Sequence, residues 1–140
     1  MTDFRDISYS VLGTEVDPRT QGYQPVYDVV VASRALHGTA SISQTLRNCR
    51  KLLRPGGNVV LLEQTIINNV APGLIGTLTG HWDDIPDGRA NGPFASLETW
   101  DESLKGAGFS GAELVLDNYP RQNNMITTLV LTLMEGSNPQ

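Results

Sequence analysis

Two side chains suited to proton transfer follow the ends of two predicted strands. His37 lies in the short loop after the β-branched run at 26–33, and Glu63 closes a second apolar run at 58–64. The unperturbed pKa of histidine, about 6.5, suits acid–base chemistry near neutral pH. Because open α/β sheets hold their ligands at the carboxyl ends of parallel strands, we expect a His–Glu pair that performs acid–base catalysis at this edge.

Glu63 interrupts an apolar strand end, where an unpaired carboxylate would be costly. It therefore needs a partner, and His37 is the most economical one. The alternative for Glu63 is a salt bridge to Arg34 or Arg89. The alternative for His37 is a loop histidine that caps a helix or faces solvent.

One helix and a Pro-Gly-Gly turn separate the two strands. Ser41 and Gln44 have the spacing of a capping box, which predicts the start of an amphipathic helix at 41–53. The apolar residues at helical spacing are Ile42, Leu46, Cys49, Leu52 and Leu53. The run at 26–33 is apolar almost throughout, which predicts a strand buried on both faces. The segment therefore predicts a βαβ unit with a right-handed crossover.

The remaining pattern predicts a second helix and a closing strand pair. Ser96 is a good N-cap, and the apolar residues Leu97, Trp100, Leu104 and Ala107 follow on one helical face before Gly108. The runs at 112–118 and 125–134 predict antiparallel strands. Residues 7–12 alternate as a short strand would, and 17–22 read as a turn or one helical turn. Tyr27, Trp100 and Phe109 are expected in the core.

Two helices are few for a sheet of this size, so one face would be thinly covered. The strand at 26–33 would also lie at a sheet edge, where an apolar strand pairs readily with another chain. We therefore expect a homodimer through the strand at 26–33.

A long irregular segment at 66–95 is rich in proline and glycine, which is typical of a functional lid or of a poorly ordered segment, and we expect a lid. Its His81 and Trp82 fit either a hydrophobic plug or a substrate contact, and Arg89 fits a carboxylate or a substrate carbonyl. Asp83, Asp84 and Asp87 indicate a solvated acidic loop rather than a cation site. Together with a polar tail at 135–140, these elements form a single expected domain over 1–140.

The composition limits the classes of function. A net charge of −5 and a pI of about 4.8 argue against nucleic acid or an anionic membrane surface as partner. No apolar run approaches the roughly 18 residues of a membrane span, and the N-terminus has no apolar signal segment. The lone Cys49 excludes an intrachain disulfide, and two histidines give no evident metal cluster. We expect a soluble, cytoplasmic protein without a metal.

Several motifs, in order and spacing, carry a family resemblance. They are Val11-Leu-Gly-Thr-Glu-Val-Asp-Pro-Arg-Thr-Gln-Gly22, Tyr27-Asp-Val-Val-Val-Ala-Ser33, Leu36-His-Gly-Thr39, Leu46-Arg-Asn-Cys-Arg-Lys-Leu-Leu-Arg-Pro-Gly-Gly57, Leu61-Leu-Glu63, Gly76-Thr-Leu-Thr-Gly-His-Trp82, Asp87-Gly-Arg89, Trp100 and Gly106-Ala-Gly-Phe-Ser-Gly111. Over nearly its whole length the chain resembles the C-terminal half of the C-methyltransferase domain of fungal highly reducing polyketide synthases.

The resemblance implies an α/β chain with a truncated, Rossmann-like class I methyltransferase fold, whose mixed sheet carries an antiparallel C-terminal strand pair. It implies binding of S-adenosylmethionine and a dyad at the positions of His37 and Glu63. In that family the histidine removes a proton from the carbon between two carbonyls, the glutamate orients and polarises the histidine, and the enolate takes the methyl group.

The chain departs from the family pattern in the half that holds the methyl donor. Neither the donor-binding Gly-rich turn nor the ribose-binding acidic residue of the next strand occurs here. Gly13 replaces the family's aspartate in a Leu-Asp-Ile-Glu type motif, and Arg34 replaces its asparagine after Ala-Ser. These departures predict that the chain alone binds no cofactor.

The sequence therefore favours a pseudo-methyltransferase of polyketide secondary metabolism that does not methylate. His37 and Glu63 would catalyse cyclisation or isomerisation of a small polyketide-type carbonyl substrate, by an aldol, Michael or pericyclic step. Arg34, His81, Trp82 and Arg89 are the expected substrate contacts. One alternative is a C-methyltransferase fragment that uses S-adenosylmethionine once a partner chain completes it. Another is a non-catalytic docking domain. The expected partners are a polyketide synthase or a carrier protein.

Overall fold

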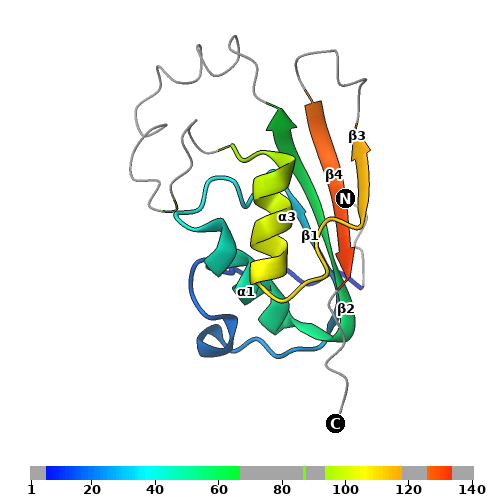
Figure 1. Cartoon of the computed structure of the whole chain (residues 1–140). Helices are drawn as coiled ribbons and strands as arrows, with labels where there is room; N and C mark the ends of the chain where they lie inside the picture. The colour runs from blue at the N-terminus through cyan, green and yellow to red at the C-terminus, as the bar shows by residue number, and fades with distance from the viewer. Residues whose placement is uncertain (1–5, 67–86, 88–93, 118–125, 134–140) are drawn as a thin grey trace, which may run out of the picture.

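The structure is a computed structural model that describes residues 6–66, 87, 94–117 and 126–133. The elements, in chain order, are the 3₁₀ helix η1 (Pro18–Gln21), β1 (Tyr27–Ser33), α1 (Ile42–Leu52), β2 (Leu53–Ile66), α3 (Leu97–Gly106), β3 (Leu114–Asp117) and β4 (Ile126–Leu133). Figure 1 shows one sheet with both α-helices packed beside it. In the described residues, no helix is long and apolar enough to cross a membrane.

The four strands form a mixed sheet in the order β1-β2-β4-β3. β1 pairs parallel to β2, while β4 pairs antiparallel to both β2 and β3. The predicted βαβ unit and the antiparallel C-terminal pair are therefore confirmed. β2 extends beyond the predicted 58–64 because the segment after Leu53 already follows β1, with a register shift between Tyr27 and Val29. At that shift Gly57 leaves little space for a side chain, since a Cβ there would lie 3.1 Å from the Asp28 carbonyl oxygen.

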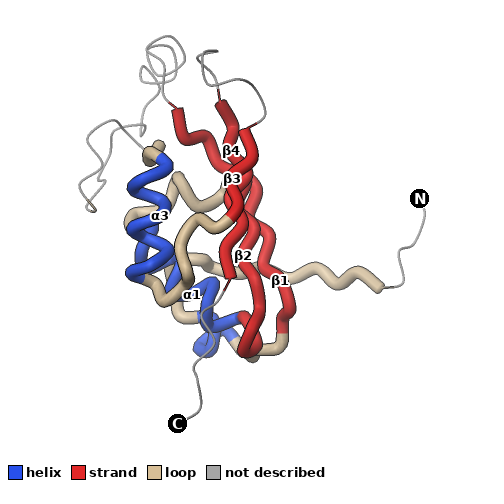
Figure 2. Tube along the Cα trace, turned by 45° about the vertical axis from the view of Figure 1, so that its right-hand side comes forward, coloured by secondary structure: helices blue, strands red, loops and turns tan. Residues whose placement is uncertain are grey.

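Both helices cover the same face of the sheet, as Figures 1 and 2 show from two directions. Their serine N-caps form as predicted: Ser41 Oγ accepts from the Gln44 amide, and Ser96 Oγ accepts from the Thr99 amide. The apolar stripes of the two helices meet the sheet in one core. Its buried members are Ala32, Leu36, Ile42, Leu46, Cys49, Leu53, Val59, Leu61, Ala95, Trp100, Leu104, Ala107 and Phe109.

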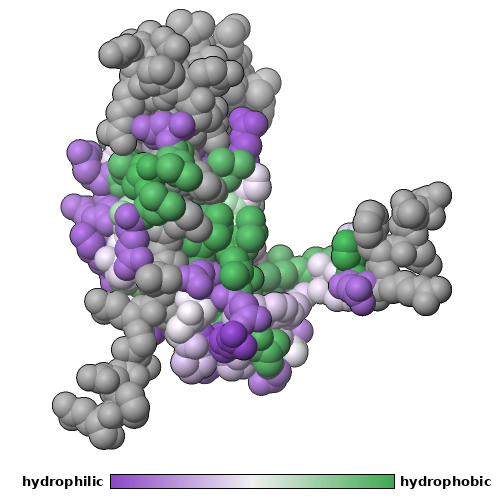
Figure 3. All heavy atoms as spheres, turned by 90° about the vertical axis from the view of Figure 1, so that its right-hand side faces the viewer, coloured by the Kyte–Doolittle hydropathy of each residue, from purple (hydrophilic) through white to green (hydrophobic). Residues whose placement is uncertain are grey.

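The opposite face of the sheet is open among the described residues. Val31 is 68% exposed, Val29 47% and Leu116 50%. The prediction that 26–33 is buried on both faces was therefore wrong, and so was the core assignment of Tyr27, which is 42% exposed. A β-branched run indicates that a strand is apolar on both faces. Burial of both faces also requires a layer on each side of the sheet, and here both helices lie on one side. Figure 3 looks onto this open face, where hydrophobic side chains gather over the strands.

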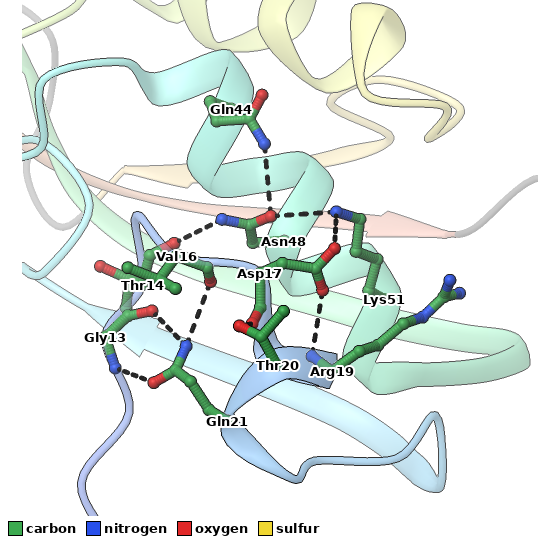
Figure 4. Close-up of polar contacts among 10 residues, drawn as sticks. All are labelled: Gly13, Thr14, Val16, Asp17, Arg19, Thr20, Gln21, Gln44, Asn48 and Lys51. Atoms are coloured by element: carbon green, nitrogen blue, oxygen red, sulfur yellow. Dashed lines mark hydrogen bonds and ion pairs between the residues drawn. The ribbon is translucent and has the colours of Figure 1, made fainter.

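The segment before β1 is anchored to α1 by polar contacts (Figure 4). Asn48 Nδ2 donates to the Thr14 carbonyl oxygen at 2.9 Å, and Lys51 Nζ lies 2.7 Å from Asp17 Oδ2. The predicted turn at 17–22 is confirmed as η1. Residues 7–12, predicted as a short strand, are not part of the sheet that the described residues form.

Candidate active site

The loop that carries His37 begins with a backbone turn at Arg34. The Arg34 amide still donates to the Leu62 carbonyl oxygen at 2.8 Å, which continues the β1–β2 pairing by one residue. Arg34 then adopts a left-handed conformation, with φ of 51°, which is uncommon for a residue with a side chain. After this turn the Ala35 and Leu36 amides converge on Glu63 Oε1, at 3.2 and 3.0 Å. Successive amides of this kind form an anion-binding concavity, and here the bound anion is a side chain of the same molecule.

Glu63 is brought to this loop by the pleat of β2. It lies on the helix-covered face with Val59 and Leu61, and all three residues are 0% exposed. Its Oε2 lies 2.8 Å from His37 Nδ1. A buried carboxylate is tolerated only when donors compensate for the loss of water. Two amides and the imidazole supply that compensation, and the His37 side chain itself stays 24% exposed.

Further contacts hold the loop between β1 and α1. Thr39 Oγ1 donates to the Leu36 carbonyl oxygen at 2.7 Å, and the Ala40 amide donates to Glu15 Oε1 at 2.6 Å. The Ile42 amide at the start of α1 donates to Asp87 Oδ2 at 3.1 Å. Asp87, predicted to be part of a solvated acidic loop, therefore also caps the first turn of α1, where a negative charge is favourable.

Phe94 is a site residue that the sequence analysis missed. Its ring stacks on the His37 imidazole, with 5.3 Å between ring centroids and 25° between ring planes. Phe94 is 9% exposed and lies two residues before the Ser96 N-cap of α3. The residue that commonly packs back on its helix is the one directly before the N-cap, here Ala95, so the local pattern gave no signal for Phe94.

The other predicted site residues are not gathered here. The Arg34 side chain is exposed, and its backbone rather than its guanidinium shapes the loop. His81, Trp82 and Arg89 lie outside the described residues, as do most of the predicted lid at 66–95 and the tail at 135–140. In the described part of the chain, no group of three His, Cys, Asp or Glu side chains could hold a metal ion.

The cofactor that the resemblance implies, S-adenosylmethionine, needs polar partners for its ribose and its amino-acid part. Among the described residues, the strand-to-helix turn at 34–41 directs the Ala35 and Leu36 amides to Glu63. Glu63, the acidic side chain at the end of β2, is committed to those amides and to His37. The described residues therefore do not by themselves fit the cofactor, and we assign no chemical step to it.

Comparison with known proteins supports the predicted resemblance. The model of a methyltransferase domain matches residues 4–59. Prosolanapyrone synthase from Alternaria solani is 51% identical over 134 residues, which are 95% of this chain and 5% of that protein. The highly reducing polyketide synthase rstn3 from Aspergillus nomiae is 38% identical over 130 residues, again 5% of its length.

The solved structures agree in fold. The structure of the trans-methyltransferase CalH in complex with SAH matches with a TM-score of 0.86 and 33% identity, over 94% of this chain and 37% of that one. The chain thus spans about a third of that methyltransferase and a small part of each synthase. The predicted Rossmann-like, class I methyltransferase fold is confirmed. These matches fit the methyltransferase alternative better than the non-methylating cyclase or isomerase. Over nearly its whole length the chain is similar to a part of fungal highly reducing polyketide synthases, and its residues 4–59 match a methyltransferase domain, so the predicted resemblance is confirmed.

Proposed function

We propose that this chain carries the proton-abstracting half of a C-methyltransferase site that acts on polyketide-type β-carbonyl substrates. The observation that supports this most directly is the buried Glu63 carboxylate, which accepts two amides on one oxygen and faces His37 Nδ1 with the other. A carboxylate only accepts hydrogen bonds, so it favours the tautomer with the proton on Nδ1. The basic lone pair is then on Nε2.

The chemistry of this half is deprotonation of a carbon acid. His37 Nε2 takes a proton from the carbon between two carbonyl groups, and the electron pair of the broken C–H bond delocalises onto a carbonyl oxygen as an enolate. The Glu63 carboxylate stabilises the imidazolium that forms and keeps its orientation. A positioned base of this kind typically contributes about 10²–10⁴-fold in rate. Arg34, His81, Trp82 and Arg89 remain our proposed substrate contacts.

The donor-binding half would come from another polypeptide segment that docks on β1 and the open sheet face. β1 is an edge strand of the sheet that the described residues form, and its own apolar side chains Val29 and Val31 are exposed. A groove of about 320 Å³ borders this strand. It is lined by Ser8, Tyr9, Ser10, Leu12, Tyr23, Tyr27, Val30 and Leu52. An unpaired edge beside an apolar face fits added strands with a covering layer. The CalH chain is nearly three times the length of its matching part, so its remainder is of a suitable size.

Exchange of the acidic protons tests the proposed base without any methyl donor. A β-ketoacyl thioester is incubated with the chain in D₂O, and deuterium uptake at the carbon between the carbonyls is followed by NMR. We expect faster exchange than in buffer, and a loss of about 10²-fold or more in His37→Ala. Arg47→Gln, on the exposed side of α1, is the surface control. Equal exchange rates for the native chain and His37→Ala would overturn the proposal.

Glu63→Gln tests the role of the carboxylate. The amide oxygen of glutamine can still accept from the Ala35 and Leu36 amides, which leaves its NH₂ group to donate to Nδ1. That contact favours the tautomer with the proton on Nε2, which cannot act as a base. We expect exchange to fall about as far as in His37→Ala while the fold survives, and an active Glu63→Gln would contradict the assigned tautomer.

Adding S-adenosylmethionine and the donor-binding part of a related synthase then distinguishes the downstream reactions. A methylated product in the mixture supports completion by a second segment. A ring-closed product without methyl transfer would instead support the non-methylating enzyme. A size-exclusion peak at twice the monomer mass, with no affinity for the donor-binding part, would show that a second copy occupies β1.

A further inference from the structure

We propose that Phe94 is a positioning residue for the base, because it fixes the plane of the His37 imidazole and ties it to helix α3. This inference rests on the proposed function of His37. The ring contact that carries it has 5.3 Å between centroids and 25° between planes.

The hydrogen bond to Glu63 alone does not fix the tilt of the imidazole plane. It holds Nδ1 2.8 Å from Oε2, but a hydrogen bond tolerates a range of angles, so small changes in the side-chain torsions of His37 still tilt the ring. A flat ring stacked on the imidazole restricts that tilt, since other planes lose the stacking contact. The two contacts together fix where Nε2 points. Direction matters because proton transfer requires the base to lie within hydrogen-bonding reach of the proton that it removes.

Phe94 is held by a rigid support. Ala95, the next residue, is 2% exposed, and the Ser96 hydroxyl fixes the first turn of α3. Trp100 and Leu104 on the same helix are both 0% exposed. A functional group is held most precisely when its supporting side chains are locked on packed helices or strands. The Phe94 ring thus connects the start of α3 directly to the His37 imidazole.

Phe94 differs from an ordinary core phenylalanine in where it packs. The core cluster includes Phe109, 2% exposed, but not Phe94. Phe94 therefore packs at the margin of the core, against the candidate base. Its π-face also lies within about 6 Å of the imidazole, the range in which an aromatic face attracts a cation. The contact would then favour the imidazolium formed after proton abstraction.

The test compares Phe94→Leu with Phe94→Tyr, and uses Phe109→Leu as the matched control. Leucine keeps an apolar side chain but lacks a flat face, whereas tyrosine keeps the face. The first readout is the ¹⁵N spectrum of the imidazoles, which reports tautomer and ring exchange without substrate. The chain has two histidines, so a His81→Gln spectrum assigns the His37 signals.

We expect Phe94→Leu to broaden the His37 signals or shift them toward a mixture of tautomers. In the deuterium-exchange assay its kcat should fall about 10- to 100-fold with little change in KM, since misorientation affects the reaction more than binding. Phe94→Tyr should retain most of both properties. Phe109→Leu should lower the Tm and leave the His37 signals unchanged.

Two results would overturn the inference. One is a Phe94→Leu chain with native imidazole signals. The other is a Phe109→Leu chain that disturbs His37 as strongly, which would make the effect one of general packing. Failure of the proposed function is recognised separately. In that case the native chain shows no accelerated exchange, while the ¹⁵N spectra still decide whether Phe94 orients the ring.

Discussion

The two faces of the sheet carry similar side chains but have opposite environments. On the covered face Val59 and Leu61 are 0% exposed, whereas on the open face Val31 is 68% and Leu116 50% exposed. Adjacent residues of one strand point to opposite faces, so the difference lies in what covers each face. Both α-helices lie on one side (Figure 2). The buried apolar area that stabilises the fold and the candidate base therefore both lie on the covered face. The open face keeps exposed apolar area to which a partner can bind.

The candidate site belongs to the covered face. Glu63 continues the row of Val59 and Leu61 along β2, and its three donors come from the loop that follows β1. The site is therefore built on core residues of β2 and of the loop that follows β1. Recognition on the open face can vary without disturbing the His37–Glu63 geometry.

The largest expected effect comes from truncating one leucine on each face. Leu61→Ala removes a fully buried side chain and should cost about 2–5 kcal/mol of unfolding free energy. Leu116→Ala, at 50% exposure, should cost less than about 1 kcal/mol. Chemical denaturation of both variants measures the difference. Similar losses in the two would mean that the open face is already covered in solution, for example by a second copy.

The sequence predicts that each helix buries one of its faces. It does not predict which face of the sheet the two helices cover. The spacing of Ile42, Leu46 and Cys49 predicted a helix with one buried face, and the spacing of Leu97, Trp100 and Leu104 predicted another. Periodicity reports that a helix has an apolar stripe. It does not report which face of a sheet the stripe meets, so the burial of β1 was overestimated.

The site was predictable to a similar degree. A carboxylate at an apolar strand end required a partner, which pointed from Glu63 to His37. The Ala35 and Leu36 amides were not predictable, because they depend on the left-handed backbone at Arg34, and arginine is not a residue type that predicts such a conformation. Phe94 was missed because its contact with His37 joins segments far apart in the chain, and no local pattern encodes such a contact.

A smaller effect is expected from relieving the backbone at Arg34. A left-handed conformation costs most residues roughly 1–2 kcal/mol, and asparagine adopts it more readily. Arg34→Asn should therefore raise the unfolding free energy by about 0.5–1 kcal/mol. Arg47→Asn is the matched control and should lower stability slightly, because Arg47 is helical and exposed. A destabilised Arg34→Asn would show that the guanidinium, rather than the turn, matters at this position.

The Asp101 carboxylate on α3 accepts a hydrogen bond from the segment that leads into β3. Its contribution to stability should depend on pH. The Lys105 ammonium and then the Ala112 amide, both bonded to Asp101, hold the pKa of its carboxyl below the usual 3.8. Because the folded-state pKa is lowered, the stabilisation is present above pH 3.8 and is lost as the pH falls through the folded value. The Lys105 pair is partly exposed, so Asp101→Asn should cost about 0.2–1 kcal/mol at neutral pH.

The control for Asp101 is Glu102→Gln, the exposed neighbour on the same helix. Denaturant midpoints measured between pH 7 and pH 3 should show a gap between the native chain and Asp101→Asn that closes in acid. The same series for Glu102→Gln should show no such gap. A pH-independent loss in Asp101→Asn would contradict a lowered pKa of the Asp101 carboxyl, because both the Lys105 pair and the Ala112 hydrogen bond favour its ionised form.

The smallest effect on the unfolding free energy of the isolated chain is expected from Val31→Thr. The same substitution tests most directly whether a partner binds the open face. Threonine has nearly the shape of valine but carries a hydroxyl. At 68% exposure that hydroxyl stays in water, so Val31→Thr should change the unfolding free energy by less than about 0.5 kcal/mol. Once a partner covers the face, the hydroxyl loses its water, and the variant should weaken binding by about 1–3 kcal/mol. Titration calorimetry with the donor-binding part of a related synthase measures that cost. Unchanged affinity would place the partner elsewhere, because a buried hydroxyl without a hydrogen bond cannot be neutral.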